Sequence, residues 1–253
     1  MPRRPSSRPP EPLLRAVRRT GGEDGAWPWT IPALRALEEL ALDPHVTLLV
    51  GENGSGKSTL IEGIAVAAGF RPEGGSLAFG PDTRDEQPPL ADALTLVRGA
   101  RRPRTGFFLR AESFFNVATA VDALASAGDL RLLNSYGGVS LHARSHGESF
   151  LALALHRFGP AGLYLLDEPE AALSPQGCFA LLRRIRDLAD EHSQFVIATH
   201  SPLLLAYPGA LIYELTDAGP VATAFEDTDH VRLTRVFLDA PERFLRQLLE
   251  DDR

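Results

Sequence analysis

The sequence predicts an α/β protein whose core is a mostly parallel sheet flanked by helices. Two runs, GLYLLD at 162–167 and QFVIAT at 194–199, are apolar along their whole length, which is typical of strands buried on both faces. A third apolar run, VTLLV at 46–50, leads directly into a glycine-rich turn and a helix start. Segments with the apolar spacing of helices lie between these runs: 59–69, 113–127, 145–158 and 175–191.

Composition limits the class of protein. With 253 residues, of which 44% are hydrophobic and 23% charged, the chain fits one large globular domain or a domain with a small lobe. The single cysteine, Cys178, excludes an internal disulfide and a thiolate metal cluster, and it fits a reducing compartment. No apolar run approaches the roughly 20 residues of a membrane helix, and the N-terminus lacks the apolar core of a signal peptide. We therefore expect a cytoplasmic protein that reaches a membrane only through a partner.

Positive charge is concentrated in two segments, although the formal net charge of −7 argues against a basic surface over the whole protein. Residues 1–12 combine five prolines with three arginines and are predicted to be a disordered basic tail. The turn GARRPRT at 99–105 gathers three more arginines beside Arg98. Such charge runs are usually solvated; the alternative is that either segment binds nucleic acid or an acidic partner.

Shorter elements are predicted around the core strands. Five of them are strands: 13–19, 94–98, 106–110, 210–215 and 220–224. The second and third are joined by the arginine turn, and the last two are expected to form a closing hairpin. The C-terminal segment 230–249, split by Pro241, is amphipathic and is expected to pack on the body. Trp27 and Trp29 are expected to pack in or beside the core, and stacking on an adenine ring is the alternative.

The glycine-rich turn, GENGSGKST, matches the phosphate-binding pattern G-x-x-x-x-G-K-[ST] between a strand and a helix. Gly51, Gly54 and Gly56 can take backbone conformations closed to other residues, so that successive N–H groups can point inward around phosphates. The helix that follows adds its positive N-terminal end to the same anion site. Lys57 supplies a point charge for the β- and γ-phosphates, and the Ser58 hydroxyl is placed to ligate Mg²⁺.

Two carboxylates, Asp167 and Glu168, end the apolar run GLYLLD, at the edge where α/β sheets place their ligands. Asp167 is suited to hold Mg²⁺, usually through water, and Glu168 to polarise the water that attacks the γ-phosphate. Capping of the next helix is the alternative. His200 ends the next core strand on the same side, which indicates a role in the same site, although a lone histidine is more often a structural hydrogen-bonder.

In this order, the motifs resemble those of ATP-binding cassette (ABC) ATPases. GENGSGKST resembles the Walker A loop, VIATHSP the switch-histidine loop, and LYLLDEPEAALSP the Walker B and D-loop string, with Ser174 where the D-loop usually has aspartate. The string from Ser145 to Glu148 stands where the LSGGQ signature is expected, with His146 in place of a glycine and glutamate in place of glutamine, as in the SMC-like branch. Glu112 occupies the place of the Q-loop glutamine.

This resemblance implies an Mg²⁺-dependent ATPase that converts ATP and water to ADP and phosphate. It implies a P-loop NTPase fold over 13–253, with antiparallel N-terminal strands and a small helical lobe at about 113–158. The implied catalytic residues are Glu168 and His200, and the implied Mg²⁺ ligands are Ser58, Asp167 and Glu112. Residues implied to bind ATP are Glu52, Asn53, Gly54, Ser55, Gly56, Lys57, Ser58, Thr59, Ser145, Gly147 and Glu148.

The resemblance is stronger to the SMC, RecF and OLD-type ATPase group than to transporter subunits. The chain departs from SMC heads in having no long coiled coil between Glu112 and Ser145, and from OLD proteins in having too short a segment after His200 for a nuclease domain. It is expected to be a compact, stand-alone head.

Partners are implied by the same resemblance. It implies a homodimer formed on ATP binding, in which Ser145 and Gly147 of the second subunit cover the γ-phosphate. Coupling to nucleic-acid maintenance or defence, through nucleic acid or a partner protein, is the expected role. The alternative is an ATP-binding subunit that energises a membrane transporter by docking on a permease.

Overall fold

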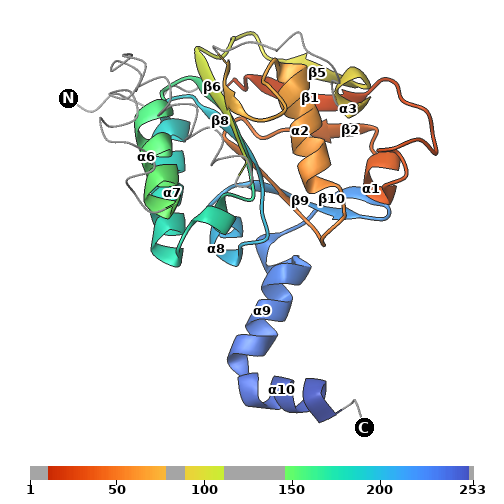
Figure 1. Ribbon diagram of the computed structural model, residues 1–253, viewed down its shortest axis with the longest axis vertical. Coiled ribbons are helices and arrows are strands. Elements are labelled where there is room, and N and C mark those ends of the chain that lie inside the picture. Colours follow the sequence, from red (N-terminus) through yellow and green to blue (C-terminus); the bar gives the residue numbers. More distant parts are fainter. Residues whose placement is uncertain (1–10, 78–88, 111–145, 251–253) are drawn as a thin grey trace.

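A seven-stranded sheet forms the centre of the computed structural model, which describes residues 11–77, 89–110 and 146–250 (Figure 1). Its strands lie in the order β10-β9-β3-β8-β7-β6-β4. Their bounds are β3 (Val46–Val50), β4 (Gly75–Ser76), β6 (Thr105–Arg110), β7 (Gly162–Asp167), β8 (Gln194–Ala198), β9 (Leu211–Thr216) and β10 (Gly219–Ala222). The five strands from β9 to β6 are parallel, and the edge strands β10 and β4 are antiparallel. The predicted mostly parallel sheet and the closing hairpin are therefore confirmed.

A second, smaller sheet is antiparallel and lies toward the N-terminus. It has the order β2-β1-β5, with β2 (Glu39–Ala41), β1 (Leu14–Arg19) and β5 (Leu94–Arg98). Both strands that flank the arginine turn were predicted correctly, but they belong to different sheets: β5 pairs with β1, and β6 pairs with β7. The four central residues of β6 are buried, whereas β5 is buried only at its first residue, so β6 takes the interior place.

Helices cover both faces of the central sheet (Figure 1). Their bounds are α1 (Pro32–Arg35), α2 (Lys57–Ala68), α3 (Pro89–Asp92), α6 (His146–Arg157), α7 (Pro175–Asp190), α8 (Pro202–Leu205), α9 (Asp229–Asp239) and α10 (Pro241–Glu250). Short 3₁₀ turns lie at Pro169–Ala172 and Phe225–Asp227. Helix α2 and the small sheet lie on one face, and α6, α7 and α8 lie on the other. The predicted helices at 59–69, 145–158 and 175–191 are confirmed within two residues at each end.

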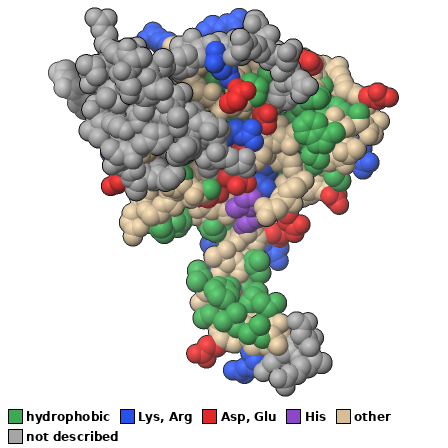
Figure 2. Space-filling view, viewed as in Figure 1, with side chains coloured by type: hydrophobic (Ala, Val, Ile, Leu, Met, Phe, Trp, Pro, Cys, Tyr) green, Lys and Arg blue, Asp and Glu red, His purple; other side chains and the backbone are tan. Residues whose placement is uncertain are grey.

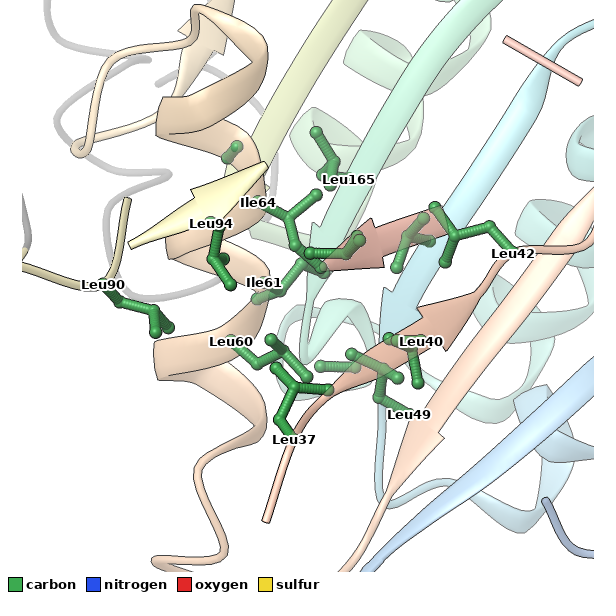
Figure 3. Close-up of a cluster of buried hydrophobic side chains, with 14 of the residues drawn as sticks. Leu37, Leu40, Leu42, Leu49, Leu60, Ile61, Ile64, Leu90, Leu94 and Leu165 are labelled. Carbon is green, nitrogen blue, oxygen red and sulfur yellow. The ribbon is translucent and has the colours of Figure 1, made fainter. Parts of the chain in front are cut away.

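Each central strand contributes alternate side chains to two separate cores. In β7, Leu163 and Leu165 pack with α2, whereas Tyr164 and Leu166 pack with α6 and α7. Figure 3 shows the first of these cores, where leucine and isoleucine side chains of α2 meet Leu37 and Leu40 from the segment before β3. Alternating burial on both faces explains why these strands are apolar without interruption.

The C-terminal helices α9 and α10 form an arm that extends away from the body (Figure 1). The expectation that this segment packs on the body is wrong for most of its length. Val231, near the start of α9, is buried, but six large apolar side chains of the arm are exposed: Leu233, Val236, Leu238, Leu245, Leu248 and Leu249. The amphipathic pattern correctly predicted an apolar face, but such a pattern does not specify what the face contacts. Figure 2 shows this apolar surface on the arm.

The two tryptophans have different environments. Trp29 is 2% exposed and packs in the core that contains α2, with the Arg19 guanidinium 3.9 Å from its ring centroid. Core packing is therefore confirmed for Trp29, and stacking of this side chain on adenine is excluded. Trp27 is 57% exposed.

Several expectations fall on residues outside the described ranges. These are Glu112, the helix at 113–127, Ser145, and most of the expected tail and lobe. Within 11–77, 89–110 and 146–250, none of the helices has an apolar stretch long enough to cross a bilayer.

Candidate nucleotide site

The loop between β3 and α2 has the backbone geometry of a phosphate cradle. Gly51, Gly54 and Gly56 all have positive φ, and Gly56, at 97°, is the N-cap of α2. A Cβ atom at Gly56 would lie 3.0 Å from the Ile31 side chain and 3.1 Å from that of Leu34, so both the conformation and the space require glycine there. The loop therefore turns tightly into the helix N-terminus, which favours an anion.

Lys57 is folded back into this loop. Its side chain is buried, and Nζ donates to the carbonyl oxygens of Gly51 at 2.9 Å and Glu52 at 2.8 Å. Burial lowers the pKa of Lys57, and neighbouring carboxylates, Glu168 foremost, oppose that shift. The ammonium is thus held inside the ring of loop backbone, where phosphate oxygens are expected.

Asp167 meets Ser58 at the carboxyl end of β7. The Ser58 hydroxyl donates to Asp167 Oδ1 at 3.0 Å, although the two residues are 109 positions apart. Hydroxyl and carboxylate oxygens are ligands that Mg²⁺ prefers, and adjacent ligands in its octahedron, at about 2.1 Å from the ion, are separated by about 3.0 Å. The pair therefore fits a magnesium ion in both chemistry and spacing.

Glu168 follows in a constrained conformation. Its φ of 49° lies in the left-handed region, which is uncommon for a residue with a side chain and costs about 1 kcal/mol or more. Its N–H donates to the Ala198 carbonyl at 2.9 Å, which ties the turn to β8. Its Oε1 lies 3.4 Å from His200 Nε2. Backbone strain of this kind clusters at functional sites, where it fixes the orientation of a side chain. Here the strained residue is Glu168, whose carboxylate faces His200.

His200 is fixed from two sides. Its backbone N–H donates to Glu170 Oε1 at 2.6 Å, and the same oxygen accepts from Thr199 Oγ1 at 2.8 Å. Its ring Nδ1 lies 2.8 Å from Nε2 of His230. Burial, and then the positive charge of Lys57, lower the pKa of His200, so the imidazole is neutral at pH 7.

An open pocket of about 410 Å³ lies beside the loop. Its lining combines loop residues with the start of α1, the end of β9 and the start of α9: Pro32, Ala33, Gly51, Glu52, Asn53, Gly54, Ser55, Glu214, Leu215, Thr216, Asp217, Asp229 and His230. Neither tryptophan is among them. The pocket has the place and size for part of a nucleotide held by its phosphates in the loop.

Comparisons with known proteins address the class of domain. A family model described as "AAA domain, putative AbiEii toxin, Type IV TA system" matches residues 146–206, and one described as "AAA domain" matches 33–87. The L-cystine transport system ATP-binding protein TcyN of Escherichia coli (strain K12) is 28% identical over 228 residues, which cover 80% of this chain and 88% of that protein. The ribose import ATP-binding protein RbsA 1 of Rubrobacter xylanophilus is 28% identical over 249 residues, which cover 87% and 47%. The chain thus spans less than half of this longer relative.

Solved structures are also similar. The structure described as "An inward-facing conformation of a putative metal-chelate type ABC transporter" has a TM-score of 0.50 and 16% identity, over 90% of this chain and 89% of that one. The SMC head domain from Thermotoga maritima has a TM-score of 0.45 and 15% identity, over 83% and 98%. The transporter structure shares the fold, and the two AAA matches cover the loop and the strands that carry Asp167 and His200. This chain thus has the P-loop ATPase fold and is similar in sequence to ABC ATPases.

The predicted residues of this ATPase domain are brought together only in part. Five of them converge at the carboxyl ends of the central strands, as expected: Lys57, Ser58, Asp167, Glu168 and His200. The signature residues that the structure describes lie elsewhere: Gly147 packs closely on the carbonyl of Ala172 in the 3₁₀ turn after β7, and Glu148 is exposed in the first turn of α6.

The arginine turn at 99–105 lies at the amino ends of β6 and β7, opposite the ends that carry the nucleotide site. The N–H of Arg104, just before β6, donates to the carbonyl of Ala161, just before β7. The side chains of this turn share a pocket of about 750 Å³ with Asp190 and Glu191. Any ligand of this turn would bind away from the nucleotide site.

Sequence reasoning missed three residues beside the candidate nucleotide site. Arg110, in register with Asp167 on the neighbouring strand, places its Nε 3.6 Å from Asp167 Oδ2 and its Nη1 3.1 Å from Glu62 Oε2. Its position at the end of an apolar strand was a signal that could have been used. Glu170 and His230, described above, carried no comparable signal.

Proposed function

We propose that this chain binds ATP with Mg²⁺ and hydrolyses it, with Glu168 as the general base. The observation that carries this proposal is the convergence of Lys57, Ser58, Asp167, Glu168 and His200 at one edge of the sheet. A phosphate cradle, a pair of magnesium-type ligands and a carboxylate held in a strained turn are the parts that phosphoryl transfer to water requires.

Each side chain has a distinct task in this mechanism. Lys57 exchanges its two carbonyl partners for phosphate oxygens, and the backbone N–H groups of the loop hold the same oxygens. Magnesium, held by Ser58 and Asp167, would supply charge neutralisation at the phosphates. Glu168 orients a water molecule and accepts its proton, and neutral His200 donates from Nε2 toward the γ-phosphate. The 3.4 Å between Glu168 Oε1 and His200 Nε2 supports a role for both side chains at the same reacting group.

The active unit that we propose is a homodimer in which two chains enclose two ATP molecules head to tail. Support comes from the resemblance of the motif set to ABC and SMC-like ATPases. Two-fold symmetry would let one self-complementary surface complete both sites, and Ser145 and Gly147 of the second chain are the proposed donors.

Two kinds of cellular work are candidates for this ATPase. Nucleic-acid maintenance or defence is favoured by the SMC-like signature and by the match of 146–206 to a model whose description includes a toxin. Energising a membrane transporter is favoured by the relatives named as ATP-binding subunits for L-cystine and ribose transport. Capture of partners with a Glu168→Gln variant in the presence of ATP distinguishes them, because a permease and a nucleic acid are recovered by different means.

Phosphate release tests the hydrolysis proposal directly. Wild-type protein should release phosphate from ATP with Mg²⁺ and stop when the metal is chelated. Glu168→Gln should bind ATP as tightly as wild type but lose about 10²-fold or more in turnover, the range for loss of a general base. Glu191→Gln makes the same chemical change at the other edge of the sheet and should leave turnover unchanged. Turnover near wild type in Glu168→Gln would show that the base lies elsewhere.

A further inference from the structure

His230 joins the C-terminal arm to the nucleotide site. It lies in the first turn of α9, and its Nε2 is 2.8 Å from Nδ1 of His200, with 5.0 Å between the ring centroids. Figure 2 shows histidine atoms where the arm leaves the body, next to acidic and basic side chains. His230 belongs to none of the nucleotide-site motifs and has no part in the mechanism above.

The position of His230 is fixed by its immediate neighbours. Thr228 is fully buried, and its hydroxyl donates to the Phe225 carbonyl at 2.9 Å. The N–H of Asp229 donates to Glu214 Oε1 at 3.1 Å, and Val231 is 3% exposed in the core beneath α8. The first turn of α9 is therefore anchored, although the rest of the helix is not covered by the body.

The contact between the two rings restricts where their protons lie. One of the two nitrogens must donate, because two lone pairs at 2.8 Å would repel. His200 Nε2 is buried and makes no hydrogen bond within the described residues, but Glu168 Oε1 lies 3.4 Å away, and the negative charge of this carboxylate favours a proton on that nitrogen. Because His200 is neutral, its Nδ1 then lacks a proton and accepts one from Nε2–H of His230.

The second nitrogen of His230 supports the same assignment. Within the described part of the chain, His230 Nδ1 is buried and has no hydrogen-bond partner. A buried N–H without an acceptor is among the rarest states of a polar group, and a lone pair without a donor is tolerated more often. The proton of His230 is thus expected on Nε2, where it is directed at His200.

We propose that His230 is a positioning residue that holds His200 in the tautomer with its proton on Nε2, ready to donate to the γ-phosphate. This inference rests on the proposed ATP hydrolysis and assigns that site a further residue. For metal-binding histidines, loss of such a hydrogen-bond partner commonly costs a factor of about 10 to 100 in affinity or activity, and we expect a similar loss here. Because His230 is part of α9, the position of the arm on the body then determines whether His200 carries its proton on Nε2.

The test compares two substitutions that differ in hydrogen-bonding capacity. His230→Leu fills a similar volume without a donor, whereas the amide nitrogen of His230→Gln can donate to the same atom. We expect His230→Leu to lower kcat about tenfold, and His230→Gln to restore it to within a factor of about three of wild type. Arg232→Gln, at an exposed position on the same helix, is the matched control and should keep the wild-type kcat.

A double substitution separates an action through His200 from a direct one. If His230 acts through His200, adding His230→Leu to His200→Ala should cause no further loss of kcat. Because His230 also lines the pocket beside the loop, ATP binding is measured on every variant. Weaker ATP binding in His230→Leu, or a further loss in the double variant, would overturn the proposal in favour of direct nucleotide contact.

The remaining outcomes are also decisive. Equal loss in His230→Leu and His230→Gln would mean that packing rather than donation matters, which overturns the proposal. A wild-type kcat in His230→Leu, with a clear loss in His200→Ala, would refute only this inference. Absence of phosphate release from wild-type protein would refute the hydrolysis proposal and this inference with it.

Discussion

Gln194 and Leu14 exchange two hydrogen bonds across 180 positions of sequence. The N–H of Leu14 donates to Gln194 Oε1 at 2.8 Å, and Gln194 Nε2 donates to the Leu14 carbonyl at 2.7 Å. The same amide nitrogen also donates to the carbonyl of Asp43 at 2.8 Å. Because Leu14 starts β1 and Gln194 starts β8, this fully buried side chain ties the small sheet to the central sheet.

Replacement of Gln194 by leucine should therefore destabilise the fold. Leucine has a similar volume but leaves buried backbone groups of Leu14 without partners, which should lower the free energy of unfolding by about 2–4 kcal/mol. Urea unfolding followed by circular dichroism measures this change. Gln176→Leu, at an exposed position of α7, is the control and should change stability by less than about 0.5 kcal/mol. Equal stability of the two variants would show that the amide does not join the sheets.

Lys57 offers a direct test of the phosphate loop because it is the only lysine in the sequence. Apart from the α-amino group, an amine-reactive reagent can modify only this side chain. Since burial lowers the pKa of Lys57, its neutral, reactive form should appear at a lower pH than in an ordinary lysine. Mass spectrometry of the modified protein should give a pH midpoint below the usual value near 10.5, and ATP with Mg²⁺ should protect the residue.

Removal of the ammonium tests the same assignment by binding. Lys57→Ala should abolish measurable binding of a labelled ATP analogue, because no other lysine can replace the charge at the phosphates. Unfolding should remain cooperative, which separates loss of the site from loss of the fold. Binding within a factor of two of wild type would contradict the assignment of this loop to phosphate.

The sequence was sufficient to predict the elements that leave a local pattern, such as strands buried on both faces and loops with a fixed motif. The strand at 162–167 was predicted with both ends correct, because burial on two faces leaves an uninterrupted apolar run and two carboxylates mark its end. Positive φ at Gly56, and the approach of Asp167 to Ser58, followed from motifs in which spacing and geometry are coupled. Local patterns were sufficient for these features.

Contacts between segments that are far apart in the sequence could not be predicted from local patterns. β5 and β6 are separated by a short turn, yet they pair with different strands, because pairing depends on partners far along the chain. Nothing near His230 in the sequence indicated that it would meet His200, 30 positions away. The arm was assigned to the body because an amphipathic pattern states that an apolar face exists, without stating what covers it.

Association on ATP is the prediction that tests the composite site. If the γ-phosphate forms part of an interface, ATP should hold two chains together and ADP should release them. Glu168→Gln, which should bind ATP without consuming it, makes this state long-lived. Static light scattering of this variant should give twice the monomer mass with ATP and Mg²⁺, and the monomer mass with ADP.

A bulky charge at the proposed signature should block this dimer while sparing the nucleotide site of each monomer. Added to Glu168→Gln, Ser145→Arg should keep the protein monomeric with ATP, yet leave ATP binding within about twofold, because the arginine is expected to clash with the second chain. Ala100→Arg introduces the same side chain in the arginine turn, at the sheet edge opposite Asp167, and should leave dimerisation intact. A Glu168→Gln protein that stays monomeric at saturating ATP, or a Ser145→Arg protein that dimerises and hydrolyses normally, would mean that another partner completes the site.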